Sequence, residues 1–539
     1  MQEEITGKPA QAEQKLYIAP TSLIRGEPLV PSSKYYTLRY LLSATLAEGE
    51  SIVSFPAISD DSDVLFCGCQ ALGAELTWHD KQLGPNPSRQ RRDRAAEPRH
   101  FANDASASSA THSGEVEGVR ATRSGNMQGE SELHVCGAGR PRSLDPITIN
   151  VGNAGAVLRL LLGVAALLPE VTLITDHPQS LGKRPNRELL EALTSLGAIC
   201  EGTGPEGYLP ITIRGGNLHG GRVSISGARS SQYLSSLLFL APLIGEEGAM
   251  MDFNKIIGQP LADPSAVARH PAWGAGNRGM MKRGDQSAPT EIVVVDRLKS
   301  QPLIHVTLKV LKEAGIVIEY DETLRHFSIA PGQHYRPGHY VVPGDYPSAA
   351  ALLAACAVTP DPASEVRLSR LRPGEEDGEA LLSALKAMGA DLRIDGETIT
   401  LRGGRRLRGI EMDGDQAIDC VPVLVALACF AQGQSVFYNI ETLHYKESDR
   451  INDLCAELRR AGCAVTPQED AIIVQGRPQG IEGGVTVDAH SDHRLLMALA
   501  IVGLRSRRGL TLSGVEHISK SYPQFFEELQ RLGVEVRYL

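Results

Sequence analysis

The sequence predicts an α/β (α+β) protein of two domains, each built from three repeated units. Two observations support this prediction. Six segments share one pattern, in which an amphipathic helix ends at a glycine and runs directly into a short apolar strand. The chain has 539 residues, of which 42% are hydrophobic, so it is long enough to form two buried cores.

The six segments follow one another at regular spacing. Their sequences are VLFCGCQALGAEL, LLEALTSLGAIC, TLKVLKEAGIVIEY, LLSALKAMGADLRI, LCAELRRAGCAV and FFEELQRLGVEVRYL, and their terminating glycines are Gly73, Gly197, Gly315, Gly389, Gly462 and Gly533. Subtraction gives intervals of 124, 118, 74, 73 and 71 residues between these glycines. A period of about 72 residues is too long for common solenoid repeats and favours three α/β units around a shared core in each domain.

The surplus length in the first two intervals has the composition of disordered insertions. Residues 81–143 are dense in Arg, Ser, Gly and Asn, and residues 262–290 form a similar run rich in Gly, Pro and Arg. Residues 1–15 are polar and acidic and are expected to form a tail. The basic run at residues 89–94 lacks interleaved aromatic residues, which disfavours nucleic-acid binding there.

Charge and cysteine content narrow the class of protein. The net charge of -10 gives no general attraction to nucleic acid or to an anionic membrane surface. The nine cysteines show no paired spacing apart from Cys67 and Cys69, which indicates neither a disulfide framework nor a zinc site. The chain has no apolar export segment and no stretch near 18 apolar residues, so we expect a cytoplasmic protein without a membrane or nucleic-acid partner.

Several polar blocks in the first half of the chain stand at predicted helix starts, and one, LKSQPL, lies in a predicted strand. A glycine at a helix start lets backbone N–H groups approach an anion closely. The blocks are PSSKYYTLR with Lys34 and Arg39, NAGAVLR with Asn153, Gly155 and Arg159, GKRP with Arg184, ARSSQ with Ser230, Ser231 and Gln232, and LKSQPL with Ser300.

Blocks in the second half add carboxylates and further cations. Asp419 directly precedes a wholly apolar helix, a position at which it could simply be an N-cap. Glu447 and Arg450 are three residues apart on one helical face, where a carboxylate can act as acid or base beside a guanidinium that holds a carboxylate ligand. The blocks are GDYPSAA with Asp345 and Ser348, AIDC with Asp419, HYKESDR with Lys446, Glu447, Asp449 and Arg450, SDHR with Arg494, and SKSYP with Lys520.

Together these blocks resemble the enolpyruvyl transferase family, and the resemblance extends along almost the whole chain outside the two insertions. It implies two inside-out domains, each of three βαβαββ-type units, joined by a two-strand hinge near Pro31 and Val342. One domain would span residues 33–342. The other would combine residues 16–32 with residues 343–539.

The resemblance also implies a reaction, in which the enolpyruvyl group of phosphoenolpyruvate moves to a hydroxyl of shikimate-3-phosphate with release of phosphate. It proceeds by addition and elimination, needs no metal or organic cofactor, and involves only small-molecule substrates and a monomeric enzyme. Asp419 would be the base for the acceptor hydroxyl, with Glu447 and Lys34 handling the methylene proton. Phosphoenolpyruvate would contact Lys34, Asn153, Gly155, Gln232, Arg450, Arg494 and Lys520, and the acceptor Arg39, Ser230, Ser231, Gln232, Ser300, Asp419 and Lys446.

Some positions depart from the family pattern. Tyr35 and Ala156 replace a Ser and a Thr, and Gln301 and Leu303 replace a Lys and a Tyr that face the acceptor. The first of two arginines ahead of a proline is missing near Ser180, so that Lys183 or Arg229 would have to supply its charge. Two alternatives therefore stay open: an enolpyruvyl transferase for a different phosphorylated acceptor, and a non-catalytic relative.

Overall fold

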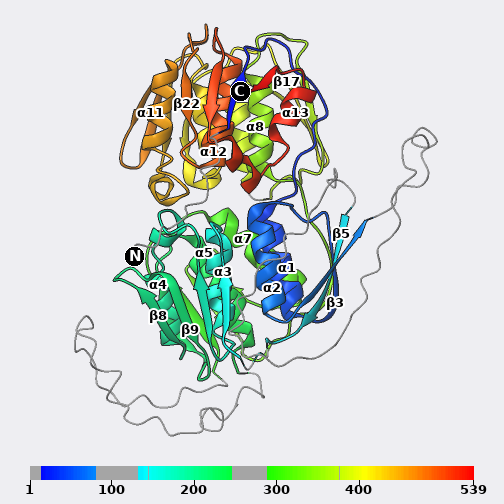
Figure 1. Ribbon diagram of the computed structural model, residues 1–539, viewed down its shortest axis with the longest axis vertical. Coiled ribbons are helices and arrows are strands. Elements are labelled where there is room, and N and C mark those ends of the chain that lie inside the picture. The colour runs from blue at the N-terminus through cyan, green and yellow to red at the C-terminus, as the bar shows by residue number, and fades with distance from the viewer. Residues whose placement is uncertain (1–13, 81–130, 142, 144, 246–287, 376) are drawn as a thin grey trace, which may run out of the picture.

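The computed structural model describes residues 14–80, 131–141, 143, 145–245, 288–375 and 377–539. These residues form two lobes stacked along the long axis of the molecule (Figure 1). Each lobe has a hydrophobic core of its own. One core is formed between residues 36 and 342, and the other by residues 16–30 together with residues 346–536. We refer to them as the first and second lobes, and we propose that they are the domains 33–342 and 16–32 plus 343–539.

The described strands form six four-stranded sheets, three in each lobe. In every sheet one edge pair is parallel and the other two pairs are antiparallel. The first-lobe strands are β3 (Glu48–Ser54), β4 (Glu75–Asp80), β5 (Ser131–Ala138), β6 (Ile147–Asn150), β7 (Val171–Ile174), β8 (Ile199–Thr203), β9 (Tyr208–Arg214), β10 (Gly221–Ile225), β11 (Thr290–Val294), β12 (Glu319–Tyr320), β13 (His326–Ile329) and β14 (His339–Val341).

The second lobe repeats this arrangement. Its strands are β1 (Lys15–Ile18), β2 (Arg25–Gly26), β15 (Glu365–Leu368), β16 (Asp391–Asp395), β17 (Thr398–Arg402), β18 (Glu411–Asp413), β19 (Gln434–Tyr438), β20 (Ala464–Pro467), β21 (Ala471–Gln475), β22 (Thr486–Asp488), β23 (Leu510–Ser513) and β24 (Val536–Tyr538). The order β18, α10 (Val421–Ala428), β19, α11 (Asn452–Ala461), β20, β21 is one βαβαββ unit, and β6, α3 (Gly155–Ala165), β7, α4 (Arg187–Ser195), β8, β9 is another. The predicted α/β fold of repeated units is thus confirmed.

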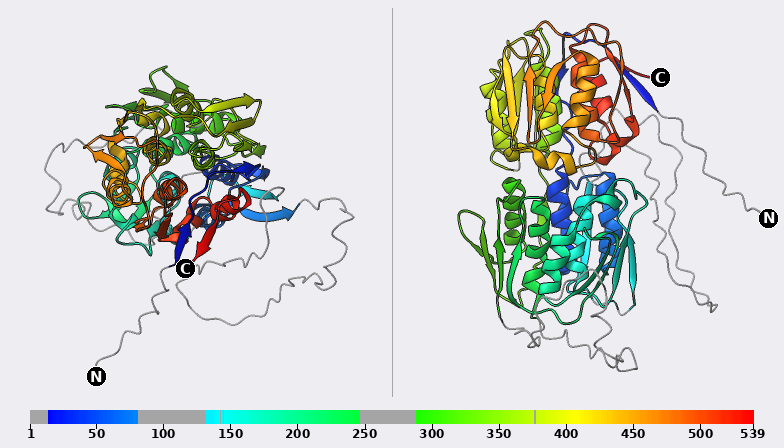
Figure 2. Two further views of the ribbon diagram at one scale, coloured as in Figure 1. Left: turned by 90° about the horizontal axis from the view of Figure 1, so that it is seen from above. Right: turned by 90° about the vertical axis from the view of Figure 1, so that its left-hand side faces the viewer.

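Each unit contributes an inner and an outer helix. The inner helices are α1 (Lys34–Leu46), α3 (Gly155–Ala165), α5 (Ser231–Leu240), α8 (Tyr346–Ala357), α10 (Val421–Ala428) and α12 (His493–Leu504), and nearly all of their residues are buried. The outer helices are α2 (Asp60–Ala71), α4 (Arg187–Ser195), α7 (Gln301–Glu313), α9 (Gly378–Ala387), α11 (Asn452–Ala461) and α13 (Phe525–Arg531). Figure 2 shows the sheets on the outside of the lobes.

The six glycines that define the repeat follow the outer helices. All of them have a positive φ, between 83° and 104°. A residue with a side chain is strained in this left-handed conformation, whereas glycine adopts it readily and so ends a helix before the next strand. The regular spacing of these glycines therefore reflects the regular spacing of the C-terminal ends of the six outer helices.

The insertion prediction was wrong at one end. Residues 131–138 fall within the predicted disordered segment 81–143 but form strand β5, which pairs with β3 and β4. Leu133 and Val135 face the core, while His134 and Cys136 alternate with them on the outer face. This alternation is typical of a half-buried strand, and the polar composition of the segment obscured it. Residues 81–130 and most of the second predicted insertion lie outside the described residues.

Two chain segments cross between the lobes side by side. The amide N–H of Ser33 donates to the carbonyl of Pro343 at 2.8 Å, and that of Asp345 donates to the carbonyl of Pro31 at 2.8 Å. Arg370 of the second lobe donates to both segments, at the hydroxyl of Ser32 and the carbonyl of Val342. The crossing is therefore a short, hydrogen-bonded pair of strands.

Glycines allow the end of an inner helix to approach the antiparallel strand that follows it. A Cβ on Gly476 would lie 1.9 Å from the carbonyl oxygen of Ala431, just beyond α10. A Cβ on Gly137 would lie 2.1 Å from the carbonyl oxygen of Ala44 in α1. Such distances are far inside van der Waals contact, so a side chain there would force the helix and sheet apart.

We expect Gly476→Ala to lower the free energy of unfolding by about 2–3 kcal/mol, because the new methyl group overlaps a backbone carbonyl that cannot rotate away. Urea unfolding measures the change. Gly182→Ala is the matched control, since its Cβ would meet no atom closer than 3.5 Å, and it should change stability by no more than about 1 kcal/mol. Equal losses in the two variants would contradict this explanation of the close packing.

Candidate functional site

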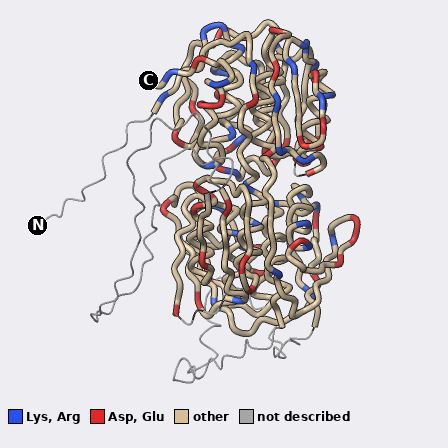
Figure 3. Tube along the Cα trace, turned by 90° about the vertical axis from the view of Figure 1, so that its right-hand side faces the viewer, with Lys and Arg blue, Asp and Glu red and all other residues tan. Residues whose placement is uncertain are grey.

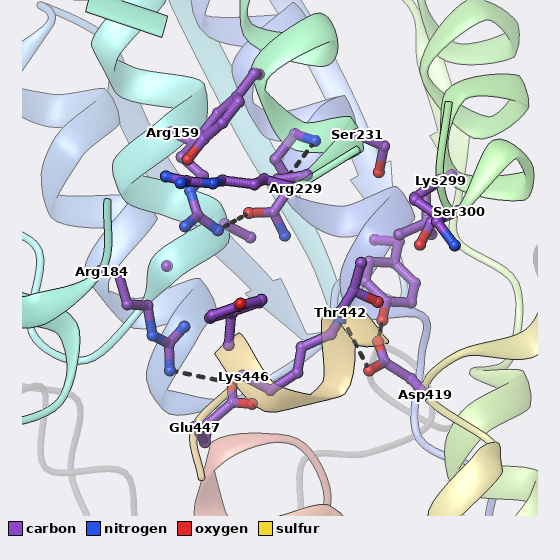
Figure 4. Close-up of a pocket in the computed structure, with 18 of the residues that line it drawn as sticks. Arg159, Arg184, Arg229, Ser231, Lys299, Ser300, Asp419, Thr442, Lys446 and Glu447 are labelled. Atoms are coloured by element: carbon purple, nitrogen blue, oxygen red, sulfur yellow. Dashed lines mark hydrogen bonds and ion pairs between the residues drawn. The ribbon is translucent and has the colours of Figure 1, made fainter. Parts of the chain in front are cut away.

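A pocket lies between the two lobes and encloses roughly 940 Å³ of empty space, including its opening to solvent. Figure 4 shows residues of both lobes pointing into it. Its lining residues are Lys34, Tyr35, Asp61, Gly155, Ala156, Arg159, Arg184, Pro185, Arg229, Ser230, Ser231, Gln232, Tyr233, Lys299, Ser300, Leu303, Asp419, Thr442, Tyr445, Lys446, Glu447, Arg450, His493 and Arg494. Most of the polar blocks singled out in the sequence thus contribute side chains to one pocket, whereas Asp345 and Ser348 of the GDYPSAA block and Lys520 of the SKSYP block are not in its lining.

Helix N-termini from both lobes meet at this pocket. Lys34, Gly155 and Ser231 are the first residues of α1, α3 and α5, and Arg494 is the second residue of α12. Asp419 stands two residues before α10. The positive end of each helix dipole and its free N–H groups favour anions, so the backbone itself predisposes the pocket to bind phosphate or carboxylate groups.

Glu447 is surrounded by cations from both lobes. Its carboxylate lies 2.6 Å from Arg450, 3.1 Å from Lys520 and 4.0 Å from Arg184, a first-lobe residue. Burial opposes ionisation, but Lys520, Arg450 and Arg184 together hold the pKa of Glu447 well below its usual range. The ionised carboxylate of Glu447 therefore contacts cations that could otherwise bind an anionic ligand.

Arg450 joins three carboxylates. Its Nε lies 2.7 Å from Asp492, its Nη1 2.7 Å from Asp419 and its Nη2 2.6 Å from Glu447. The side chain is almost completely buried, and burial alone would lower its pKa, but the three carboxylates raise it. Arg450 fixes the relative positions of these groups, because a planar guanidinium holds its partners in fixed directions.

Asp419 is held by both lobes. Arg450 and Lys446 contact its Oδ1, at 2.7 and 3.5 Å, and the hydroxyl of Tyr35 in the first lobe donates to its Oδ2. Burial would raise its pKa, but Lys446, Arg450 and Arg494 lower it further than burial raises it. The carboxylate is therefore ionised and able to accept a proton.

Lys34 faces the same region from α1. Its Nζ lies 2.9 Å from Asp61, and both side chains are buried. Burial would lower the pKa of Lys34, but Asp61 and Glu447 raise it above its ordinary value. The Lys34 side chain is therefore protonated at neutral pH where it lines the pocket.

Other cations in the pocket have vacant hydrogen-bonding positions. The Nε and Nη1 of Arg494 and the Nε and Nη2 of Arg184 are buried without a hydrogen-bond partner. Both ring nitrogens of His493 are also buried without one, and burial holds the pKa of His493 well below its usual range, so its ring is neutral. Each guanidinium has only a long ion pair, Arg184 with Glu447 and Arg494 with Asp345, both at 4.0 Å, so their remaining donors are available to an anion.

Gly155 allows Arg184 to reach this position. A Cβ at Gly155 would lie 2.6 Å from Nη1 of Arg184, so only glycine leaves room for the guanidinium against the start of α3. Lys183, which the sequence offered as a replacement cation near Ser180, is not among the lining residues. Arg184 and Arg229 line the pocket instead, and Arg229 pairs with Glu206 and Glu188.

The opposite end of the pocket carries hydroxyl and amide groups. Gln232 accepts a hydrogen bond from Arg159 at 2.8 Å, and the hydroxyl of Ser230 caps α5. Lys299 forms a 2.6 Å ion pair with Glu441 of the second lobe, and the N–H of Ser300 donates to Asp415 of the second lobe at 2.9 Å. Both contacts connect this end of the pocket across the lobes.

The sequence matches the family model described as EPSP synthase (3-phosphoshikimate 1-carboxyvinyltransferase) over residues 118–264 and 284–529. It is 37% identical to the 3-phosphoshikimate 1-carboxyvinyltransferase of Deinococcus radiodurans over 524 residues, which cover 97% of this chain and 96% of the relative. The chain belongs to the EPSP synthase family. The family prediction made from the sequence blocks is confirmed.

Further relatives agree with this assignment. The 3-phosphoshikimate 1-carboxyvinyltransferase of Methanocella arvoryzae is 37% identical over 400 residues, which cover 74% of this chain and 82% of the relative. EPSP synthase from Acinetobacter baumannii has a similar fold, with a TM-score of 0.68, 23% identity and coverage of 98% of this chain and 100% of that one. The enolpyruvyl transferase NikO from Streptomyces tendae has a TM-score of 0.65, 15% identity and coverage of 98% and 99%. These two structures support the fold.

Three residues that the EPSP synthase resemblance placed on substrate lie outside the lining of the pocket. Arg39 is buried in the first lobe, where its Nε donates to Thr307 at 2.8 Å and its Nη1 donates to the carbonyl of Tyr35. Asn153 and Lys520 contact each other behind the pocket, with 3.0 Å between the Lys520 Nζ and the Asn153 carbonyl oxygen. They can act on the site only through Tyr35 and Glu447 or after a local movement.

The sequence blocks missed some lining residues. Lys299 precedes the predicted Ser300, Asp61 pairs with Lys34, and Thr442 and Tyr445 come from the 3-10 helix η5 (Glu441–Tyr445). Lys299 and Asp61 are adjacent to polar motifs, which is the only local signal for them. In the described part of the chain, no group of three or more His, Cys, Asp or Glu side chains could hold a metal ion, and no helix is long and apolar enough to cross a bilayer.

We expect Arg450→Met and Arg494→Met to have different effects on the ligand-free protein. Arg450→Met leaves three buried carboxylates without their partner and should lower the melting temperature by roughly 5–10 °C. Arg494→Met removes a guanidinium that has two nitrogens without hydrogen bonds and only a 4.0 Å ion pair with Asp345, and it should change the melting temperature by less than about 3 °C. Thermal unfolding at neutral pH measures both. A larger loss for Arg494→Met would show that its charge is already compensated.

Asp377 gives stability a pH dependence. It lies at the N-terminus of α9 with Oδ2 unpartnered, and burial raises its pKa from 3.8 to about 7, with Arg494 and Lys446 opposing the shift. A raised folded-state pKa favours folding below pH 3.8, and this contribution is lost as the pH rises through 7. Asp377→Asn should therefore match the wild type near the acid end and melt at a higher temperature at pH 8.5. Parallel melting curves across this pH range would contradict the assignment.

Proposed function

We propose that the protein transfers the enolpyruvyl group of phosphoenolpyruvate to a hydroxyl of shikimate-3-phosphate and releases phosphate. The main support is the pocket itself, where Lys34, Arg184 and Arg494 offer positive charge beside the buried carboxylate of Asp419 and the half-buried carboxylate of Glu447. Membership of the EPSP synthase family identifies the reaction for which such a set of groups is suited.

Phosphoenolpyruvate would lie at the end of the pocket near Glu447. Arg494 and Arg184 have unpartnered nitrogens there, and Lys34 is a permanent cation. Arg450 would hold the substrate carboxylate or phosphate by sharing one of its nitrogens. The remaining assigned residues support this end: Gly155 and Gln232 from the lining, and Asn153 and Lys520 from behind it.

The phosphorylated acceptor would lie at the opposite end. Ser230, Ser231 and Gln232 at the start of α5 would bind its phosphate, since a helix N-terminus and hydroxyl groups suit a phosphate dianion. Ser300 and Lys446 would contact the rest of the acceptor. Arg39 would support this end by holding the carbonyl of Tyr35.

The chemistry follows from these positions. Removal of the acceptor proton towards Asp419 lets the oxygen attack the central carbon of the enolpyruvyl group, while a proton is added to the methylene carbon. Loss of phosphate and of a methyl proton then regenerates the double bond. Because substrate anions would share the cations around Glu447, binding would raise the pKa of that carboxyl, so that Glu447 could exchange the methylene proton while the Lys34 ammonium stabilises the carboxylate form.

A different phosphorylated acceptor is the second candidate. Tyr35, Ala156 and Leu303, three of the positions that depart from the family pattern, all line the pocket. They change its shape at the acceptor end while leaving the cations at the other end in place.

We also propose a cytoplasmic monomer, consistent with the free state of all nine cysteines.

Phosphate release from phosphoenolpyruvate is the deciding measurement, made with shikimate-3-phosphate and with a panel of phosphorylated sugars and nucleotides. Release that depends on shikimate-3-phosphate supports the proposed reaction. Release only with another compound identifies the second candidate. A folded protein that is silent with every acceptor is a non-catalytic relative.

Glu447→Gln and Arg494→Ala should each reduce phosphate release at least about 100-fold, because one removes the acid and base group and the other removes a cation for the substrate anion. Glu516→Gln, on an exposed part of the second lobe, is the control and should retain wild-type turnover. Circular dichroism confirms that each variant is folded. Wild-type rates in both pocket variants would rule out this site.

A further inference from the structure

Both oxygens of the Asp419 carboxylate already contact protein groups, and the first lobe contacts Oδ2 through Tyr35. Arg450 and Lys446 occupy its Oδ1, and the Tyr35 hydroxyl donates to its Oδ2. An acceptor hydroxyl that enters the pocket therefore meets the Tyr35 oxygen on its way to Asp419. This contact joins residues 384 positions apart in the chain and links the first turn of α1 to the loop before α10.

Tyr35 is placed to contact both the pocket and the carboxylate. Its side chain lines the pocket but is only 4% exposed, so its ring has little freedom to move aside. Arg39 holds the backbone carbonyl of Tyr35, and every residue of α1 is buried. The hydroxyl thus has a fixed position, with Asp419 on one side and the empty volume on the other.

We infer that Tyr35 relays the acceptor proton to Asp419. This inference rests on the proposed function. In one concerted step the acceptor O–H bond breaks and its proton joins the Tyr35 oxygen, while the former Tyr35 proton moves to Oδ2 of Asp419. The freed electron pair of the acceptor oxygen forms the bond to the central carbon of the enolpyruvyl group, while the C=C π bond breaks and its electron pair takes a proton at the methylene carbon. Tyr35 is neutral before and after the step, and Asp419 gains one proton.

A relay explains how a carboxylate whose two oxygens both contact protein groups can still act as a base. No rotation of Tyr35 and no separation of Asp419 from Arg450 is needed, because each proton moves along an existing or incoming hydrogen bond. If Tyr35 instead only shaped the acceptor end, its hydroxyl would affect the binding of the acceptor and not the rate of the step. The two roles predict different kinetic effects.

Tyr35→Phe removes only the hydroxyl and tests the relay. We expect kcat to fall at least about 100-fold with the acceptor KM changed less than about threefold. Tyr36→Phe is the matched control, because Tyr36 is the next residue on α1, is buried in the first-lobe core and does not line the pocket. It should retain wild-type turnover. A kcat for Tyr35→Phe within threefold of wild type, or a change confined to KM, would overturn the relay.

A double variant provides a second and independent measurement. If Tyr35 acts only through Asp419, then Tyr35→Phe combined with Asp419→Asn should be no slower than Asp419→Asn alone. Rate losses that multiply would show separate roles and overturn the relay. A wild-type protein that releases no phosphate with any acceptor would refute the proposed function itself, which distinguishes that failure from failure of the relay.

Discussion

The structure depends on the meeting of inner-helix N-termini at the interface between the lobes. Helices such as α8, α10 and α12 are buried along their whole length, so their unpaired backbone N–H groups can meet polar partners only at the ends. In the second lobe these ends bear Asp345, Asp419 and Asp492, and in the first lobe they bear Lys34 and Ser230. Because the helix bodies are buried in apolar cores, their polar end groups lie at the interface between the lobes, where the pocket forms.

The charges of the site pair with one another across the interface. Glu447 lies among cations of both lobes, and Asp419 bonds to Tyr35 of the first lobe and Arg450 of the second. Protein carboxylates therefore occupy positions suited to substrate anions. Anionic ligands would compete with these carboxylates for the same cations, so binding, the ionisation of Glu447 and the contact between the lobes are physically coupled.

Much of the fold was predictable from the sequence, because a glycine follows each outer helix and these glycines recur along the chain at regular intervals. The Glu447 and Arg450 pair was predictable for a similar reason, since i,i+3 spacing on one turn brings the side chains together. Strand β5 was missed because its outer face is polar. Three features of the site depend on contacts between residues that are far apart in the sequence. They are the hydrogen bond of Arg39 to Thr307, the ion pair of Lys299 with Glu441 and the hydrogen bond of Tyr35 to Asp419, and no local sequence pattern predicts them.

Tyr35 and Arg39 illustrate how one substitution changes the use of its neighbours. With a small residue at position 35, Asp419 Oδ2 would be open to the pocket, and the acceptor hydroxyl could reach it directly. The tyrosine ring fills that space and ties α1 to the second lobe, while Arg39 holds the backbone of Tyr35 from behind. Arg39, which the sequence predicted to contact the acceptor, thus holds Tyr35 in position instead. The acceptor end therefore differs from a simple serine-lined site in shape and in the route that a proton must take.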